Sequence, residues 1–180
     1  MLYDKTWTLF LDRDGVINRR LPDAYVRRWS EFIFEPDVPE AIAILSEIFG
    51  RIVVVTNQQG IGKGLMSEAD LAAIHRQMVA EIERAGGRID RVYHCPHLRS
   101  DACACRKPQT GMAQQARADF PDINWTRSVM VGDMPSDIEF GRNAGMQTVF
   151  ISTTDYSPPF TGAHFAHLRD FAHQLKAYNC

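Results

Sequence analysis

Short apolar runs alternate along the chain with segments in which apolar residues recur at helical spacing. The apolar runs predict buried strands, and several of these runs are rich in β-branched residues. The predicted strands lie at residues 7–12, 51–57, 91–95, 128–133 and 147–152. Strands that alternate with helical segments in this way are typical of an α/β domain with a mostly parallel sheet.

The helical segments carry start and stop signals. Ser67 is a typical N-cap before an apolar stripe that ends near Gly86, and Gly50 and Gly145 close two other segments. The predicted helices lie at residues 38–49, 67–86, 110–118, 137–143 and 163–178. We therefore expect a three-layer, Rossmann-like α/β fold, with a parallel sheet flanked by helices, in a single domain over residues 1–180.

Composition and charge narrow the class of protein. Hydrophobic residues make up 45% of the chain and charged residues 23%, values that are ordinary for a globular protein. The formal net charge is −2 and no basic stripe stands out, so we expect no nucleic-acid partner. No apolar run is long enough to span a bilayer, and the first residues do not resemble a signal peptide. We expect a cytoplasmic monomer without a membrane partner.

Polar residues close three of the predicted strands. Asp12 ends the first strand and Asp133 ends the fourth, while Thr56 and Asn57 end the second. Ligands of open α/β sheets bind outside the carboxyl ends of the parallel strands. We therefore expect two carboxylates, a hydroxyl and an amide to face one crevice.

Pairs of aspartates at these strand ends suit a divalent cation. Asp12 and Asp14 are two residues apart, which places their side chains on one face of an extended segment, and Asp133 precedes Asp137 by four residues. Carboxylates this close repel each other unless a cation or a proton lies between them, and Mg²⁺ prefers oxygen ligands. Each pair has a plainer explanation: an Asx turn for the first, and a favourable helix N-terminus for Asp137.

The glycine-rich segment QQGIGKG follows the second strand and predicts a flexible turn. It is not a P-loop, because Gly64 follows Lys63 where a P-loop has serine or threonine. The Thr56 hydroxyl just before it can hold phosphate oxygens. Lys107 supplies the further cation that a phosphate and several carboxylates in one crevice require.

Together these residues resemble the four motifs, in order, of the haloacid dehalogenase-like phosphohydrolases. The matching positions are Asp12-x-Asp14-Gly15-Val16, Thr56, Lys107 and Gly132-Asp133-x-x-x-Asp137. The resemblance implies that Asp12 is the nucleophile, which forms an aspartyl-phosphate. It implies that Asp14 is the general acid for the leaving group and later the base for water.

The same resemblance implies the ligands. Thr56 and Lys107 would hold the transferring phosphoryl group. Mg²⁺ would be bound by Asp12, the backbone carbonyl of Asp14 and Asp133, with Asp137 in support. Because a nearby cation opposes protonation of Asp14, we expect its carboxyl group to face the leaving group rather than the metal.

Three of the four cysteines lie close together, in the order Cys95-x-His97 and then Cys103-x-Cys105. Three thiolates and one imidazole complete a tetrahedral Zn²⁺ site with no open position, which indicates a structural site. A disulfide would leave an odd cysteine and conflicts with the expected compartment, and no Cys-x-x-Cys redox motif is present. Unligated thiols are the alternative. The spacing suggests that zinc fixes the direction of Arg106 and Lys107.

The cysteine loop resembles the capless branch of this superfamily that contains D-glycero-D-manno-heptose 1,7-bisphosphate phosphatases and histidinol-phosphate phosphatases. The segments DRDGVIN, TNQQGIGKG and RKPQTGM resemble the heptose enzymes more, whereas the short span between His97 and Cys103 resembles the histidinol-phosphate enzymes. We expect a small sugar phosphate as substrate, preferably the heptose bisphosphate cleaved at its 7-phosphate, with Asn57 and Arg106 also contacting it. A receiver-like phospho-acceptor domain is the non-enzymatic alternative, which the acid/base Asp14 disfavours.

Overall fold

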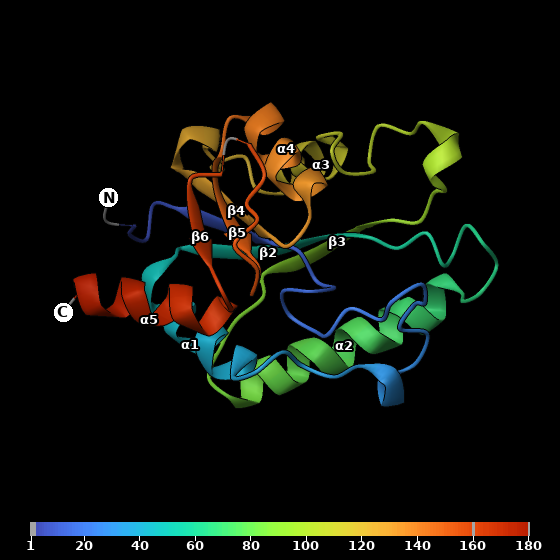
Figure 1. The fold of residues 1–180 in the computed structure, drawn as a ribbon, viewed down its shortest axis with the longest axis horizontal. Helices are drawn as coiled ribbons and strands as arrows, with labels where there is room; N and C mark the ends of the chain where they lie inside the picture. Colours follow the sequence, from blue (N-terminus) through green and yellow to red (C-terminus); the bar gives the residue numbers. More distant parts are fainter. Residues whose placement is uncertain (1–2, 160, 180) are drawn as a thin grey trace.

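The computed structural model describes residues 3–159 and 161–179. The strands are β1 (Thr8–Leu11), β2 (Arg51–Asn57), β3 (Arg91–Cys95), β4 (Ser128–Gly132), β5 (Gln147–Ile151) and β6 (Ala163–Phe165). All of them join one parallel sheet in the order β3-β2-β1-β4-β5-β6 (Figure 1). The five strands predicted from the apolar runs are confirmed, with ends that differ by one residue at most.

Helices cover both faces of the sheet. They are α1 (Val38–Ile48), α2 (Glu68–Arg84), α3 (Gly111–Asp119), α4 (Pro135–Ala144) and α5 (Leu168–Asn179), with short 3-10 helices η1 (Trp29–Glu31), η2 (Arg99–Asp101) and η3 (Trp125–Arg127). In Figure 1, α1, α2 and α5 lie on one side of the sheet and α3 and α4 on the other. The expected three-layer Rossmann-like fold is confirmed, and the described residues contain no separate cap domain.

Two hydrophobic cores lie between these layers. Leu9 and Leu11 point into the core beneath α1 and α2, whereas Phe10 between them points into the core beneath α3 and α4. All three side chains are fully buried. Since successive side chains of a strand point to opposite faces, a continuous apolar run is what a strand covered on both faces requires.

The end of the chain differs from the expected single helix over residues 163–178. Ala163–Phe165 instead forms β6, which pairs with β5 at the edge of the sheet. Helix α5 begins only at Leu168, because the Asp170 carboxylate accepts the backbone N–H of His167 and so caps the helix there. The helix expected from residue 137 also starts earlier, at Pro135, a favoured first helical residue.

The topology fixes where a ligand can bind. The chain leaves β1 toward β2 on one side and reaches β4 on the other, so the strand order reverses beside β1. Open α/β sheets bind ligands at such a switch point, beyond the carboxyl ends of the strands. Asp12 follows β1 and Asp133 follows β4, so both carboxylates lie at this position.

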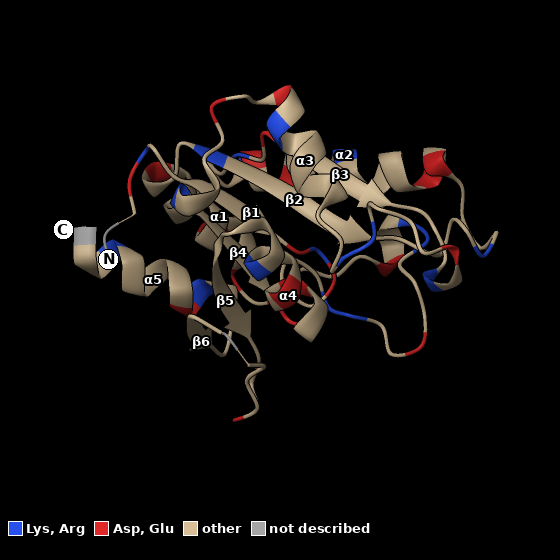
Figure 2. Cartoon of the chain, turned by 90° about the horizontal axis from the view of Figure 1, so that it is seen from above, with Lys and Arg blue, Asp and Glu red and all other residues tan. Residues whose placement is uncertain are grey.

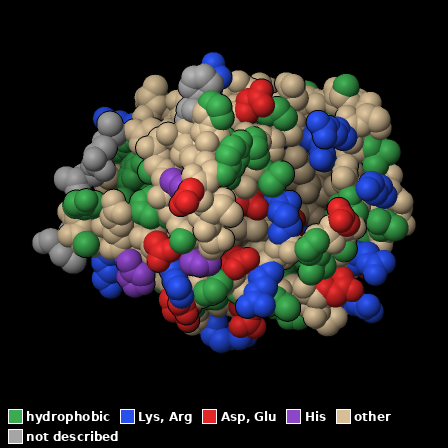
Figure 3. All heavy atoms as spheres, in the orientation of Figure 1, with side chains coloured by type: hydrophobic (Ala, Val, Ile, Leu, Met, Phe, Trp, Pro, Cys, Tyr) green, Lys and Arg blue, Asp and Glu red, His purple; other side chains and the backbone are tan. Residues whose placement is uncertain are grey.

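Charged residues gather away from the sheet. The strands are almost entirely tan in Figure 2, while Lys, Arg, Asp and Glu mark the loops and helices. On the face shown in Figure 3, positive and negative side chains are interspersed. None of the helices among the described residues combines the length and the apolar character that a membrane span needs.

Candidate active site

Three carboxylates converge at the switch point. Oxygen atoms of Asp12, Asp133 and Asp137 all lie within 4.8 Å of one another. Asp137 sits in the first turn of α4, and one of its oxygens accepts the backbone N–H of Met134 at 3.0 Å. A Cβ on Gly132 would lie only 2.1 Å from the Cβ of Asp137, so glycine is required for this close approach. The Asp14 carboxylate is not part of the cluster.

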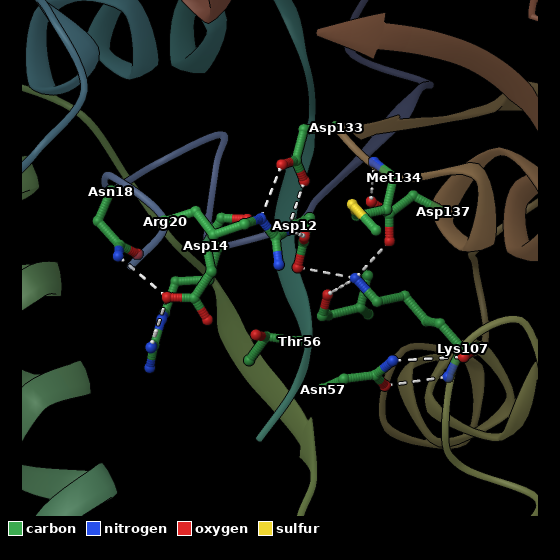
Figure 4. Close-up of polar contacts among 12 residues, drawn as sticks. Asp12, Asp14, Asn18, Arg20, Thr56, Asn57, Lys107, Asp133, Met134 and Asp137 are labelled. Carbon is green, nitrogen blue, oxygen red and sulfur yellow. Dashed lines mark hydrogen bonds and ion pairs between the residues drawn. The ribbon is translucent and has the colours of Figure 1, made fainter. Parts of the chain in front are cut away.

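Lys107 lies between two of these carboxylates (Figure 4). Its buried Nζ is 2.7 Å from Asp12 Oδ1 and 2.8 Å from Asp137 Oδ1, and it also donates to the backbone carbonyl of Val55. Burial alone would lower the pKa of Lys107, but the two carboxylates outweigh burial and raise it. The lysine therefore stays charged, and its three donors are directed at fixed oxygens.

Asn57 holds the backbone of Lys107, a contact that was not predicted from the sequence. Its side chain accepts the backbone N–H of Lys107 at 3.0 Å and donates to the carbonyl of the same residue at 3.3 Å. The end of β2 therefore clamps the backbone that carries the lysine. Asn57 also lines the cavity described below, so a contact with substrate stays a prediction.

Asp12 resists ionisation in this environment. Burial, followed by repulsion from Asp137, raises the pKa of Asp12 to about 8, although Lys107 opposes the change. A carboxylate must be ionised to act as a nucleophile. Further positive charge beside Asp12 would favour the ionised form, which is consistent with a cation bound at this cluster.

The Asp14 carboxylate is held in a separate web of hydrogen bonds. One oxygen accepts from Arg13 Nη2 at 2.8 Å and from Asn18 Nδ2 at 3.0 Å. The other accepts from Gln58 Nε2, which also donates to the Thr56 hydroxyl, both at 2.8 Å. Burial raises the pKa of Asp14, but the charge of Arg13 and these hydrogen bonds outweigh it and leave the pKa below its ordinary value.

Arg13 is the largest fully buried side chain among the described residues, and sequence reasoning missed it. Besides Asp14, it contacts His75 Nε2 at 3.2 Å on α2, and it lies over the ring of Phe32. Burial and the charge of Arg13 lower the pKa of His75 to about 3, so the imidazole stays neutral and can accept a hydrogen bond from the guanidinium. The only sequence signal was an arginine enclosed by two aspartates.

Arg20 was also missed, and it lies against the carboxylate cluster (Figure 4). Its guanidinium forms a two-pronged pair with Asp133, with Nε 3.0 Å from Oδ2 and Nη2 2.8 Å from Oδ1. Nη2 also donates to the backbone carbonyl of Asp14 at 2.6 Å and lies 3.7 Å from Asp12 Oδ2. These are the groups that the family resemblance assigns to Mg²⁺.

A cavity of about 160 Å³ opens onto these groups. The expected site residues that line it are Asp12, Asp14, Thr56, Asn57, Arg106, Lys107 and Asp137. Arg106 also lines an adjoining cavity of about 470 Å³, together with Arg99. The buried Nη1 of Arg106 has no hydrogen-bond partner within the described residues, so it remains available to a ligand.

The cysteine loop brings its four expected ligands together. Sγ of Cys95 lies 3.4 Å from that of Cys103 and 2.7 Å from that of Cys105, while His97 Nδ1 lies 3.6 Å from Cys95 Sγ and 3.1 Å from Cys105 Sγ. The three cysteines are free of disulfides. Soft sulfur donors with one imidazole fit Zn²⁺, which binds thiolates at about 2.3 Å.

The loop is anchored next to the carboxylate cluster. The carbonyl of Cys95 accepts the backbone N–H of Gln58, and the carbonyl of Pro96 accepts that of Gly62, so the glycine-rich turn packs on the loop. On the other side, the carbonyl of Ala104 accepts the backbone N–H of Gly111 at the start of α3. Lys107 follows two residues after Cys105, and its backbone is held by Asn57.

The carboxylate cluster fits a hard divalent cation. It offers carboxylate oxygens and the Asp14 backbone carbonyl, which are the ligand types of Mg²⁺. A positively charged guanidinium already lies among these oxygens, which shows that the arrangement accepts a cation. With Thr56 and Lys107 on the same cavity, the arrangement can bind a phosphate beside a buried carboxylate.

Comparison with known proteins agrees with this geometry. The family model described as HAD-hydrolase-like matches residues 104–175. The D-glycero-alpha-D-manno-heptose-1,7-bisphosphate 7-phosphatase of Mycobacterium tuberculosis is 45% identical over 137 residues, which cover 76% of this chain and 72% of that protein. The enzyme of the same name from Campylobacter jejuni is 33% identical over 172 residues, covering 96% of this chain and 97% of that protein.

A solved structure extends the comparison to three dimensions. The D,D-heptose 1,7-bisphosphate phosphatase of Bordetella bronchiseptica, complexed with magnesium and phosphate, superposes with a TM-score of 0.86 at 32% identity. The match covers 96% of this chain and 99% of that one. The chain therefore belongs to the haloacid dehalogenase-like phosphatases, which are phosphoric monoester hydrolases, in the family that contains the heptose-1,7-bisphosphate 7-phosphatases.

Proposed function

We propose that this chain removes the 7-phosphate from D-glycero-D-manno-heptose 1,7-bisphosphate, as a single domain over residues 1–180. The observation that carries the proposal is the convergence of Asp12, Thr56 and Lys107 on one cavity, in a chain whose relatives are named for this reaction. Those relatives are hydrolases, so they give no support to a receiver-like signalling role.

In the first step an Asp12 oxygen attacks phosphorus while the bond from phosphorus to the sugar oxygen breaks. Asp14 gives its proton to the departing oxygen. In the second step water attacks phosphorus, Asp14 takes the proton from that water, and the bond to Asp12 breaks to release inorganic phosphate. The web around Asp14 holds the carboxyl group in place for both transfers.

The charge on each group follows from its neighbours. Asp14 has a lowered pKa in the free protein, and the negative charge of an arriving phosphate raises it again, which favours the acid form. Lys107 and Thr56 face the phosphoryl oxygens. Asp12, Asp133 and the carbonyl of Asp14 would hold Mg²⁺, with Asp137 in support. When bound, that ion offsets the negative charge of the phosphate and of Asp12.

The assay that tests the substrate uses both anomers of the heptose 1,7-bisphosphate and histidinol phosphate, each with Mg²⁺. We expect kcat/KM for a heptose bisphosphate to exceed that for histidinol phosphate by on the order of 100-fold, because Arg99 and Arg106 offer charge to a second phosphate. Phosphorus NMR of the product would show which phosphate is lost. A preference for histidinol phosphate contradicts the proposal.

The loop cysteines and His97 would hold a structural Zn²⁺. We expect Cys105→Ser to lose zinc, to lower the melting temperature, and to raise KM by about tenfold while kcat falls less. The reason is that Arg106 depends on the loop for its position, whereas Lys107 is also held by Asn57, Asp12 and Asp137.

Metal analysis and steady-state kinetics measure this effect, with Cys180→Ser as the control because that cysteine is not part of the loop. Unchanged kinetics in a Cys105→Ser protein that has lost its zinc would show that the loop does not position substrate-binding groups.

A further inference from the structure

The geometry points to Arg20 as a built-in competitor of the metal ion, a guanidinium that occupies the cation position and must leave before Mg²⁺ binds. This inference rests on the proposed metal site. It goes beyond that site because Arg20 is not among the residues expected to bind the metal. Its basis is the set of oxygens that the guanidinium contacts.

Arg20 contacts the same oxygen atoms that are proposed to bind Mg²⁺. Nη2 of Arg20 is 2.6 Å from the carbonyl oxygen of Asp14, 2.8 Å from Asp133 Oδ1 and 3.7 Å from Asp12 Oδ2. A Mg²⁺ ion bound by the same three oxygens would lie about 2.1 Å from each of them. A guanidinium nitrogen this close to two of the three oxygens occupies their lone pairs and repels a second cation, so Arg20 and the ion compete for the same oxygens.

Arg20 offsets charge while it is in place. The side chains of Asp12 and Asp133 are largely buried, and burial raises the pKa of both. The guanidinium pairs with both carboxylates, and Asp133 helps to hold the pKa of Arg20 above its ordinary value. Without any cation, the cluster of Asp12, Asp133 and Asp137 would repel itself.

Arg20 also has room to leave. Its side chain is 43% exposed, in contrast to the 2% of Lys107, the other cation at the cluster. It lines the cavity next to Asp12 and a second cavity of about 420 Å³, which Glu35 also lines. Mg²⁺ therefore binds only to molecules in which Arg20 has withdrawn from the oxygens. The apparent Kd for Mg²⁺ is the intrinsic Kd divided by the fraction of such molecules.

The test is a calorimetric titration with Mg²⁺. The protein is first freed of Mg²⁺ by dialysis without a chelator. We expect Arg20→Gln to bind Mg²⁺ about tenfold more tightly than wild type, and Arg20→Lys to lie between the two. Arg19→Gln is the matched control, because it removes the same charge from the neighbouring residue, which is exposed and lines the 420 Å³ cavity. Its affinity should stay within about twofold of wild type.

Thermal melting gives a second readout that does not depend on activity. Without Mg²⁺, Arg20→Gln should melt below wild type, and saturating Mg²⁺ should raise its melting temperature more than that of wild type. Equal or weaker Mg²⁺ binding by Arg20→Gln overturns the inference, as does equal tightening by Arg19→Gln. If neither wild type nor Arg20→Gln binds Mg²⁺, the proposed metal site itself is wrong, and the inference fails with it.

Discussion

Asp12→Asn is expected to lower kcat for phosphate release at least about 10³-fold, because the amide lacks the charged oxygen that attacks phosphorus. The substitution preserves the size and shape of the side chain. Lys107 keeps its contacts with Asp137 and the carbonyl of Val55, so the lysine stays in place. A large loss of activity would therefore report on the nucleophile rather than on a displaced lysine.

The same variant should fold with a melting temperature within about 5 °C of wild type. Two effects oppose each other here. Asn removes the ion pair between Asp12 and Lys107, but it also removes a buried carboxyl group whose pKa is raised to about 8 and which is costly to ionise. Retained stability with lost activity is the combination expected of a catalytic residue.

Phosphate-release kinetics and thermal melting measure these outcomes. Asp122→Asn is the control, because it makes the same chemical change at a surface residue that pairs only with Arg51 in the described contacts. Acid quenching of wild type during turnover, followed by peptide mass spectrometry, should locate phosphate on Asp12. If Asp12→Asn keeps kcat within about tenfold of wild type, the covalent mechanism is wrong.

The sheet could be predicted from the sequence because its central strands are covered on both faces. Such strands appear as continuous apolar runs, and the polar residues Asp12, Thr56 and Asp133 mark where three of these runs end. β6 could not be predicted in this way. It has three residues, none of them fully buried, and it is a strand only because it pairs with β5.

The sequence predicted the motif residues Asp12, Thr56, Lys107 and Asp133. The fold brings them to one end of the sheet, because three of them lie at the ends of strands and Lys107 lies in the loop that follows β3. Their supporting partners were not predicted. Arg13 is distinguished from a surface arginine only by contacts with residues such as His75, which is 62 positions away. No local pattern encodes such a pairing.

The preference for a heptose bisphosphate as substrate was predicted from the sequence, although two features of the sequence disagreed. The short cysteine loop favoured the histidinol-phosphate enzymes, while the strand-end motifs favoured the heptose enzymes. The relatives from Mycobacterium tuberculosis and Campylobacter jejuni support the second interpretation. Loop length is a weak guide because surface loops tolerate insertions and deletions at little thermodynamic cost.

Substitution of Gly15 is expected to have the second largest effect, because this glycine lies directly against Asp133, a proposed metal ligand. Its φ angle is +97°, in a region that favours glycine. A Cβ at this position would lie 2.0 Å from Asp133 Oδ2 and 2.4 Å from its Cγ. Gly15→Ala therefore cannot be accommodated unless the Asp133 carboxylate leaves its present position.

We expect Gly15→Ala to weaken Mg²⁺ binding by more than about tenfold, to lower kcat/KM by on the order of 100-fold, and to cost about 1–3 kcal/mol of folding stability. Gly64→Ala is a matched control, because Gly64 also has a positive φ angle, +70°, but nothing lies within 4 Å of the point that its Cβ would occupy. The control should lose stability from backbone strain alone and keep its affinity for Mg²⁺. Calorimetric titration and thermal melting of both variants separate the two effects. If Gly15→Ala binds Mg²⁺ as tightly as wild type, the space that Gly15 leaves for the Asp133 carboxylate is not needed for the cation site.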